Sequence, residues 1–566
     1  MFFRQKTTQG RTYLQIVENK REEGRVRQRV LVTLGRLDEL KASGHLDSLL
    51  RSGVRFAEHL AILDTQRQEG GDGFPVYRIG PALVFEKLWR ETECRYALTE
   101  SLKGTKFNFS VERAIFLTVL HRLFDPGSDR AAEKWRQGYR IQGVEELQLH
   151  HLYRAMFWLG KPLSEDQQTG ATPFSPRCTK DLIEEDLFFR KRDLFTELSM
   201  VFFDTTTLYF EGEGGESLGE RGHSKDGCPE CKQMIVGIIM DNNGNPLCCE
   251  MWPGNTADVT SLVPVVERLK KRFHLQRVCI VADRGMISKD VIARLEGNEL
   301  QWDFILGVRM RRQREVKDEV LSRAGRYQEV HPERNSSKDP SPLKVKEVWH
   351  EGRRYVVCLN EAQARRDALV RETLIESLRE KLRQGDKALV GNRGYQRYLK
   401  SEGKHFSIDE DKLKEEARFD GKWVLRTNTD LTTAEVALKY KQLWMVEALF
   451  RSIKSLFETR PIYHKRDETI RGHVFCSFLA LVLRKELQDR LEAKEYEVEW
   501  EDVINDLDNL EEMEFQQGAQ TFLLRSQSRG CCGKVFQAAK VAMPPTVRDM
   551  GSVGAGTQRG QCVVPR

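Results

Sequence analysis

Three short, continuous apolar segments between residues 200 and 252 constrain the fold of this chain more than any other feature. They are MVFFD (200–204), QMIVGIIMD (233–241) and PLCCEMW (246–252), and turn residues such as NNGN separate them. Short apolar runs bounded by turn residues indicate strands. We therefore expect an antiparallel β-meander over this stretch.

Two helix and strand pairs follow the meander. The helical stretch DVTSLVPVVERLKKRF precedes the strand VCIVAD, and the helix KDVIARLEG precedes the strand WDFILGV (302–308). Three antiparallel strands, then helix, strand, helix and strand, is the order of a ribonuclease-H-like mixed sheet. Continuous apolar strands suit a sheet that helices cover on both faces. The sequence therefore predicts an α/β fold with a ribonuclease-H-like mixed sheet flanked by helices.

Asp204 and Asp283 each end one of these expected strands. Asp204 closes MVFFD, and Asp283 closes VCIVAD, with Arg284 and a glycine directly after it. A single strand-end aspartate commonly forms a turn, and this alternative applies to each residue taken alone. A third carboxylate, Glu447, lies on the helix YKQLWMVEALFRSIK. Three converging carboxylates can hold two divalent cations, which is how proteins cut and join phosphodiesters.

The helix that carries Glu447 also carries Tyr440 and Lys454, each seven residues away. Seven residues at 100° each make two turns less about 20°, so the three side chains share one face. The tyrosine could stack or donate a hydrogen bond, and the lysine could contact a phosphate as a point charge. The alternative is an amphipathic surface helix with incidental charges.

The remaining chain divides by composition and periodicity. Alternating residues on both sides of the turn KREEG indicate a hairpin, followed by a helix over 37–66 and a linker at 68–75. We expect six parts. They are an N-terminal hairpin and helix segment (1–67), a helical region (76–195), a discontinuous domain with the three carboxylates (196–308 and 431–490), a β-rich insertion (309–430), a C-terminal helical segment (491–529) and a disordered tail (530–566).

The composition bears on the cellular compartment and on possible phosphate contacts. Hydrophobic residues make up 40% and charged residues 31%, no apolar run is long enough to span a bilayer, and the N-terminus lacks an apolar signal core. Twelve irregularly spaced cysteines suggest reduced thiols, so we expect a cytoplasmic protein. The net charge of +6 is modest, and the basic clusters KREEGRVRQR, RMRRQR and LKKRFHLQR could meet phosphate or be solvated surface.

Several further residues are candidates for supporting roles. Trp252 could stack on a displaced base, although a buried strand-end tryptophan is the alternative. Lys225 lies beside Ser224 in a loop that could face phosphate, and Arg284 beside Asp283 is a further candidate DNA contact. Asp258 is better explained as the N-cap of the following helix than as a ligand.

A zinc site is a weaker expectation. Cys228 and Cys231 form one CPEC pair, and the adjacent Cys248 and Cys249 do not make a matching second pair, because neighbouring strand residues point to opposite faces.

Five segments resemble the DDE transposases of bacterial insertion sequences, within the large "insertion sequence four" superfamily. They are DTTTLYFEG, GHSKDG, PLCCEMWPGNTADVTSL, VADRGM and the YKQLWMVEALFRSIKS helix. The superfamily's helix pattern is Tyr-x2-Arg-x3-Glu-x6-Lys, which Tyr440, Glu447 and Lys454 match. Leu443 occupies the arginine position. Either Lys441 or Arg451 could supply the missing charge, or this branch could manage without it. The N-terminal hairpin and RPIYHKRDETIRGHVF also resemble one branch of this superfamily.

The resemblance implies a mechanism and partners. Asp204, Asp283 and Glu447 would hold two Mg2+ ions, which Mn2+ could replace. A homodimer in a synaptic complex would bind double-stranded DNA at the element ends through the N-terminal hairpin and helical region, cut it, and join it to target DNA near the bacterial nucleoid. A ribonuclease-H-like nuclease without strand transfer, or a decayed DNA-binding descendant, are the alternatives.

Overall fold

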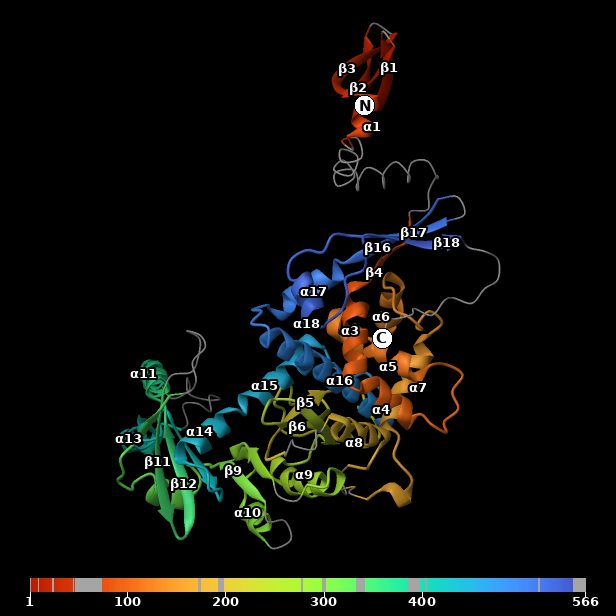
Figure 1. The fold of residues 1–566 in the computed structure, drawn as a ribbon. Coiled ribbons are helices and arrows are strands. Elements are labelled where there is room, and N and C mark those ends of the chain that lie inside the picture. Colours follow the sequence, from red (N-terminus) through yellow and green to blue (C-terminus); the bar gives the residue numbers. More distant parts are fainter. Residues whose placement is uncertain are drawn as a thin grey trace. The chain divides into compact units, whose positions relative to one another are not determined.

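The computed structural model describes the chain except for residues 1, 9, 23–24, 44, 46–73, 170, 172–174, 192–197, 276–277, 298–301, 332–341, 385–396, 403–404, 518–519 and 553–566. The chain divides into two compact units, whose elements Figure 1 labels. The smaller unit consists of Met1–Val76, Met513–Leu524 and Val547–Arg566. The larger unit consists of Tyr77–Glu512 and Arg525–Thr546.

The smaller unit begins with a three-stranded antiparallel sheet of order β1-β2-β3. Its strands are β1 (Phe2–Thr8), β2 (Arg11–Glu22) and β3 (Arg25–Arg36). The expected hairpin is the β2–β3 pair, and β1 adds a third strand that the sequence pattern did not reveal. Of the helix expected over 37–66, α1 (Leu37–Ala42) is observed, and residues 46–66 lie outside the described chain, as does most of the expected linker.

The larger unit is built on one nine-stranded mixed sheet. Its strands run in the order β10-β11-β12-β15-β9-β8-β5-β6-β7. They are β5 (Met200–Tyr209), β6 (Gln233–Asp241), β7 (Pro246–Pro253), β8 (Cys279–Ala282), β9 (Asp303–Gly307), β10 (Gln328–Val330), β11 (Leu343–His350), β12 (Arg353–Leu359) and β15 (Lys422–Thr427). The meander β5-β6-β7 is antiparallel, and β8 and β9 follow parallel to β5, which confirms the expected strand order.

Helices cover both faces of this sheet, because alternate residues of its strands enter two separate cores. On β5, Val201 and Phe203 pack with the helices α9 (Asp258–Arg272) and α10 (Lys289–Glu296). Phe202 belongs to the opposite core, which includes the helices α14 (Thr433–Lys441), α15 (Trp444–Arg451) and α16 (Asp467–Glu492). The fold is therefore of the mixed α/β class, with a large sheet between helices.

The expected insertion does not form a β-sheet entirely of its own. Its strands β10, β11, β12 and β15 continue the central sheet, because β15 pairs with the free edge of β9. A separate two-stranded pair forms from β13 (Leu399–Glu402) and β14 (His405–Ile408). The helices α11 (Glu361–Gln384) and α13 (Glu410–Ala417) complete this part.

The helical region packs around α16, which is buried on all sides along its first four turns. Its helices are α3 (Gly80–Glu91), α4 (Cys94–Ser101), α5 (Val111–Phe124), α6 (Asp129–Trp135), α7 (Leu149–Gly160) and α8 (Thr179–Lys191). A Cβ on Gly160 would lie 2.0 Å from the Glu468 carbonyl oxygen, and one on Gly472 would lie 1.9 Å from that of Met156. Glycine at both positions lets the backbones of α7 and α16 touch.

Across the part of the chain that the structure describes, no helix has the length and apolar character needed to cross a bilayer.

The C-terminal part differs from the expected disorder after residue 530. The helices α17 (Trp500–Asp508) and α18 (Cys532–Ala538) and the strands β16 (Glu511–Gln517), β17 (Gln520–Arg525) and β18 (Val547–Ser552) are ordered, and β17 pairs with β18. The expectation was wrong for α18 and β18, because α18 buries Cys532, Val535 and Phe536 at helical spacing within a glycine-rich context. Residues 553–566 lie outside the described chain. The short strand β4 (Val76–Arg78) lies where the chain passes between the two units.

Candidate active site

The register of β5 and β8 brings two of the expected carboxylates side by side. The strands are parallel and pair Phe203 with Ala282, so Asp204 and Asp283 are the next residues in register. The pKa of Asp204 is raised to about 6, chiefly by burial and to a smaller extent by the Asp283 and Asp258 carboxylates, while the Lys225 ammonium and the Thr205 N–H oppose this rise. The Asp204 carboxylate is therefore harder to ionise than an exposed aspartate.

Tyr440 fixes Asp283. Its hydroxyl donates a hydrogen bond of 2.8 Å to Asp283 Oδ1, and burial together with this carboxylate raises the pKa of Tyr440 well above its usual range. A Cβ on Gly307 would lie 2.2 Å from the tyrosine oxygen. The glycine that ends β9 therefore makes room for the aromatic ring, and the sequence-predicted tyrosine orients a carboxylate.

Lys225 and Asp258 form a supporting network beside Asp204. Lys225 Nζ donates to the Thr205 carbonyl and hydroxyl oxygens at 2.9 Å and lies 3.1 Å from Asp258 Oδ2. The Thr205 hydroxyl donates to Asp258 Oδ1 at 2.8 Å. Lys225 is thus paired within the protein rather than free for phosphate, and Ser224 accepts hydrogen bonds from loop N–H groups.

Asp258 is a further acidic residue near Asp204. It is the first residue of α9, whose N-cap is Ala257, so the expected N-cap role was wrong by one position. Its carboxylate instead ties α9 to β5 through Thr205. The sequence signal for this role was weak, because an aspartate in the first turn of a helix is explained by the helix dipole alone.

Glu447 lies on α15 with an exposed side chain. Among the described residues its carboxylate has no hydrogen-bond or ion-pair partner. Its neighbours Val446 and Phe450 pack in the same core as Phe202. Because strand residues two apart share a face, Asp204 projects toward that same side of the sheet.

The helix that was expected to carry Tyr440, Glu447 and Lys454 on one face is not continuous. It breaks between α14 and α15 at residues 442 and 443, where N–H groups donate to carbonyls three residues back, and a π-helical turn follows over Ser452–Leu456. The prediction of one uninterrupted helix face was therefore wrong, because both irregularities alter the 3.6-residue period. Leu443, at the position of the family's arginine, is buried, and Arg451 is exposed.

Lys454 is engaged at the far end of this segment. Its ammonium donates to Asp226 Oδ1 at 2.6 Å, and Arg460 contacts the same oxygen at 2.5 Å. Asp226 follows Lys225, so this ion pair ties the helical segment to the loop beside Asp204. Burial lowers the pKa of Lys454.

Two other expected contacts have different positions in the structure. Trp252 is only 1% exposed and packs edge-on against Phe203, so the proposal that it stacks on a displaced base is wrong for this structure. The large apolar ring is more stable in the core than at the sheet edge. Arg284, by contrast, is exposed in the turn directly after Asp283.

Among the described residues, Cys228 and Cys231 lie close to Glu230, and no second cysteine pair joins them to complete the expected zinc site. Cys228 and Cys231 form a disulfide, which differs from the expectation that all thiols are reduced. The other cysteines in the described residues are free and buried.

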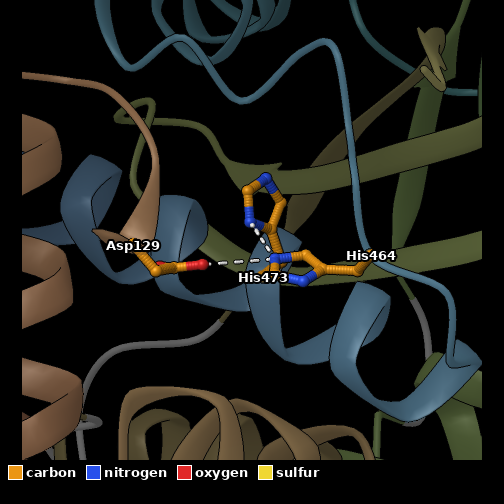
Figure 2. Close-up of side chains that lie close together, drawn as sticks. All are labelled: Asp129, His464 and His473. Carbon is orange, nitrogen blue, oxygen red and sulfur yellow. Dashed lines mark hydrogen bonds and ion pairs between the residues drawn. The ribbon is translucent and has the colours of Figure 1, made fainter. Parts of the chain in front are cut away.

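A second group with metal-binding side chains lies away from this site. His464 Nε2 lies 3.4 Å from Asp129 Oδ2 and 3.1 Å from His473 Nδ1 (Figure 2). The buried Arg122 guanidinium also donates to His473 Nδ1, at 2.8 Å. A cation at this point would compete with a buried positive charge, so these residues fit a hydrogen-bonded network between α5, α6 and α16 better than a metal centre.

A mixed sheet with carboxylates at one edge is the arrangement expected of enzymes that act on phosphodiesters with divalent cations, since carboxylate oxygens are ligands for such ions. Residues 196–483 match the family model described as the transposase DDE domain, and residues 3–66 match that of the IS1634 family transposase N-terminal domain. The first match spans just over half of the 566 residues, so the chain belongs to the DDE transposase family. It is an enzyme of the DDE type from an insertion sequence, and this family generally uses divalent metal ions.

Two further comparisons add little. No match was found among curated proteins. Among solved structures, a cryo-EM structure titled as a piggyBac transposase synaptic complex with hairpin DNA is similar, with 10% sequence identity, a TM-score of 0.38, and coverage of 76% of this chain and 79% of the other.

Proposed function

We propose that this transposase binds the terminal inverted repeats of its insertion sequence, cuts the DNA there, and joins the freed strand to target DNA. The observation that carries this proposal is the pairing of Asp204 and Asp283 in adjacent register, with Tyr440 bonded to the second carboxylate. The N-terminal strands and the helical region (76–195) are the proposed DNA-end-binding parts. Double-stranded DNA is the substrate, a homodimer in a synaptic complex is the working assembly, and the bacterial cytoplasm and nucleoid are its location.

Asp204, Asp283 and Glu447 are the proposed ligands of two Mg2+ ions, which Mn2+ can replace. Carboxylate oxygens suit these hard cations. The raised pKa of Asp204 supports the assignment, because its burial among acids is unfavourable without a compensating positive charge. Bound divalent ions would stabilise the charge that develops on the phosphate and activate the attacking water or hydroxyl.

The chain's own residues prepare this site. Tyr440 holds Asp283 in one orientation, and the Lys225 and Asp258 network holds the strand beside Asp204. Glu447 stands in the segment between Tyr440 and Lys454, both of which contact the surroundings of the two aspartates. The position of Glu447 between these two contacting residues supports it as the third carboxylate, and so does the core that α15 and β5 share. The sheet order supports a ribonuclease-H-like core.

A strand-transfer assay tests the proposal. A duplex that ends at the cleaved 3′-hydroxyl of the inverted repeat is incubated with the protein, Mg2+ and supercoiled target plasmid. Joined product supports transposition. Cleavage of an uncut end without any joined product, in the same buffer, would instead support a nuclease, and neither product would support a decayed descendant.

A further inference from the structure

A cavity of about 350 Å³ opens directly beside Asp283. Its walls come from two chain segments, the turn after β8 with Arg284 and the segment 309–312 after β9, which contributes Arg309, Arg311 and Arg312. Four arginines therefore line one small cavity, in which Asp283 is the single carboxylate. This basic segment is the RMRRQR cluster, for which the sequence alone left phosphate contact and solvated surface equally open.

Two of these arginines hold the cavity's shape. Arg309 Nε donates to the Arg284 carbonyl at 3.0 Å, and its Nη2 donates to the Gly285 carbonyl at 2.7 Å. This guanidinium therefore fixes the turn that follows Asp283. Arg311 Nε contacts Glu416 at 3.0 Å, and its guanidinium lies 5.0 Å from the centre of the Phe419 ring.

The other two arginines have their donors available. Arg284 and Arg312 are exposed, and within the described part of the chain neither side chain has a hydrogen-bond or ion-pair partner. Asp283 does not neutralise them by direct contact, since no ion pair joins them and one of its oxygens accepts the Tyr440 hydroxyl. The cavity therefore offers two unpaired guanidinium groups, which suit an anion with several oxygens.

We propose that this cavity binds a backbone phosphate of the DNA strand next to the phosphate that is cut, with Arg284 and Arg312 as its ligands. The inference rests on the proposed function, because it is the position beside Asp283 that identifies the phosphate as one of the substrate strand. Arg284 and Arg312 are then positioning residues. They hold the neighbouring nucleotide so that the scissile phosphate reaches the carboxylates.

Binding without chemistry tests this proposal separately from catalysis. Affinity for a fluorescent end duplex is measured in EDTA as a function of salt for wild type, Arg284→Gln, Arg312→Gln and the control Arg314→Gln. Arg314 belongs to the same basic cluster but does not line the cavity, and its side chain is 96% exposed. We expect each cavity variant to lose about tenfold in affinity and to lower the slope of log K against log salt by about one, while the control changes neither.

A neutral linkage locates the phosphate. Single methylphosphonates are placed in turn at each linkage near the cleavage position. We expect one linkage to weaken wild-type binding about tenfold and to have no further effect in Arg312→Gln, which shows that the residue and that phosphate act together. Competition by inorganic phosphate at constant ionic strength distinguishes a free anion from a DNA phosphate, and only strong displacement at millimolar concentration would assign the cavity to the free anion.

Unchanged affinity and salt slope in both cavity variants, or a methylphosphonate penalty that persists in them at every linkage, would overturn the proposal. Thermal melting verifies that the variants fold. We expect them to fold because both substituted positions are exposed. If wild type shows no preference for end sequences, the proposed function is in doubt, yet the salt slopes on any duplex still decide whether the cavity binds phosphate.

Discussion

The Tyr440 hydroxyl donates a hydrogen bond of 2.8 Å to Asp283 across 157 positions of sequence. This contact joins the end of β8 to the helical segment that carries Glu447. It links the aspartate pair to the segment of the proposed third carboxylate. Several expected outcomes depend on it and on its surroundings.

Removing the tyrosine hydroxyl is expected to weaken metal binding. Tyr440→Phe keeps the ring against Gly307 but leaves Asp283 without its donor. Loss of a partner that orients a metal ligand typically lowers metal affinity about 10- to 100-fold. Titration of Mn2+ and the Mg2+ dependence of end cleavage measure the change, with Tyr463→Phe as control because Tyr463 is 63% exposed. Equal metal affinity in Tyr440→Phe and wild type would show that the hydroxyl serves folding alone.

Neutralising any one proposed ligand is expected to abolish metal-dependent cleavage. Asp204→Asn, Asp283→Asn and Glu447→Gln keep side-chain size while removing the charge that a divalent cation requires. Binding of the end duplex in EDTA should stay largely intact, since DNA affinity depends on the basic groups. A variant that still cuts at the wild-type rate removes its residue from the site.

Asp204 also predicts a pH dependence of stability in the absence of metal. Its pKa is about 6 in the folded chain against an ordinary value of 3.8. Between these values the folded state keeps a proton that the unfolded state loses, so the free energy of unfolding falls as pH rises through this window. Above pH 6 the full penalty is present, and Asp204→Asn, which cannot ionise, should be more stable than wild type by about 1–3 kcal/mol in EDTA.

Thermal or urea unfolding at pH 8 and pH 4 measures this difference, which should nearly vanish at pH 4. Adding Mg2+ at pH 8 should stabilise wild type and leave Asp204→Asn unaffected. If Asp204→Asn is less stable than wild type at pH 8 in EDTA, the burial of the ionised Asp204 carboxylate does not destabilise the folded protein.

The Lys454 ion pair makes a paired prediction about DNA binding. Lys454 can contact phosphate only if it leaves Asp226, whose side chain is 4% exposed. Lys454→Ala should then weaken end binding and reduce the salt slope by about one, and Asp226→Asn should tighten binding by releasing the ammonium. If neither change alters binding, the pair only ties the helical segment to the loop that contains Lys225.

A buried ionic network predicts a stability effect outside the site. Arg272 on α9 is 4% exposed and contacts Asp181, Glu184 and Glu250 at 2.7–3.1 Å. Arg272→Met removes one of the buried cations that neutralise these acids, which Lys180 and Arg268 also contact, and should cost about 3–5 kcal/mol. Arg294→Met removes an exposed pair with Glu267 and should cost about 0–1 kcal/mol. Similar unfolding midpoints for the two variants would contradict the structural role of the network.

The sequence allowed the sheet to be predicted because its strands are short apolar runs between clear turns. The same pattern located Asp204 and Asp283, since a charged residue after a buried run marks the end of a strand's burial. The break at residues 442 and 443 could not be predicted, because no glycine or proline marks it. Nor could the joining of β15 to β9, because such long-range pairing leaves no local signal.

The supporting residues were harder to assign. Lys225 and Asp258 pair directly and also share Thr205, which lies 53 residues before Asp258, so only the folded chain brings the three together. Trp252 illustrates the opposite error, where a residue type suited to stacking on bases is held in the core by the strand alternation that buries Phe203 beside it. The residue types suggested roles in binding DNA or metal, and the packing of the folded chain determined which side chains are accessible for those roles.

A crystal or cryo-EM structure of the complex with end DNA and Mn2+, with the ions located by their anomalous signal or density, tests the central claim most directly. We predict two ions about 3.5–4 Å apart, with Asp204, Asp283 and Glu447 all among their ligands. Ions bound by the aspartates and Asp258, with Glu447 directed to solvent, would contradict it.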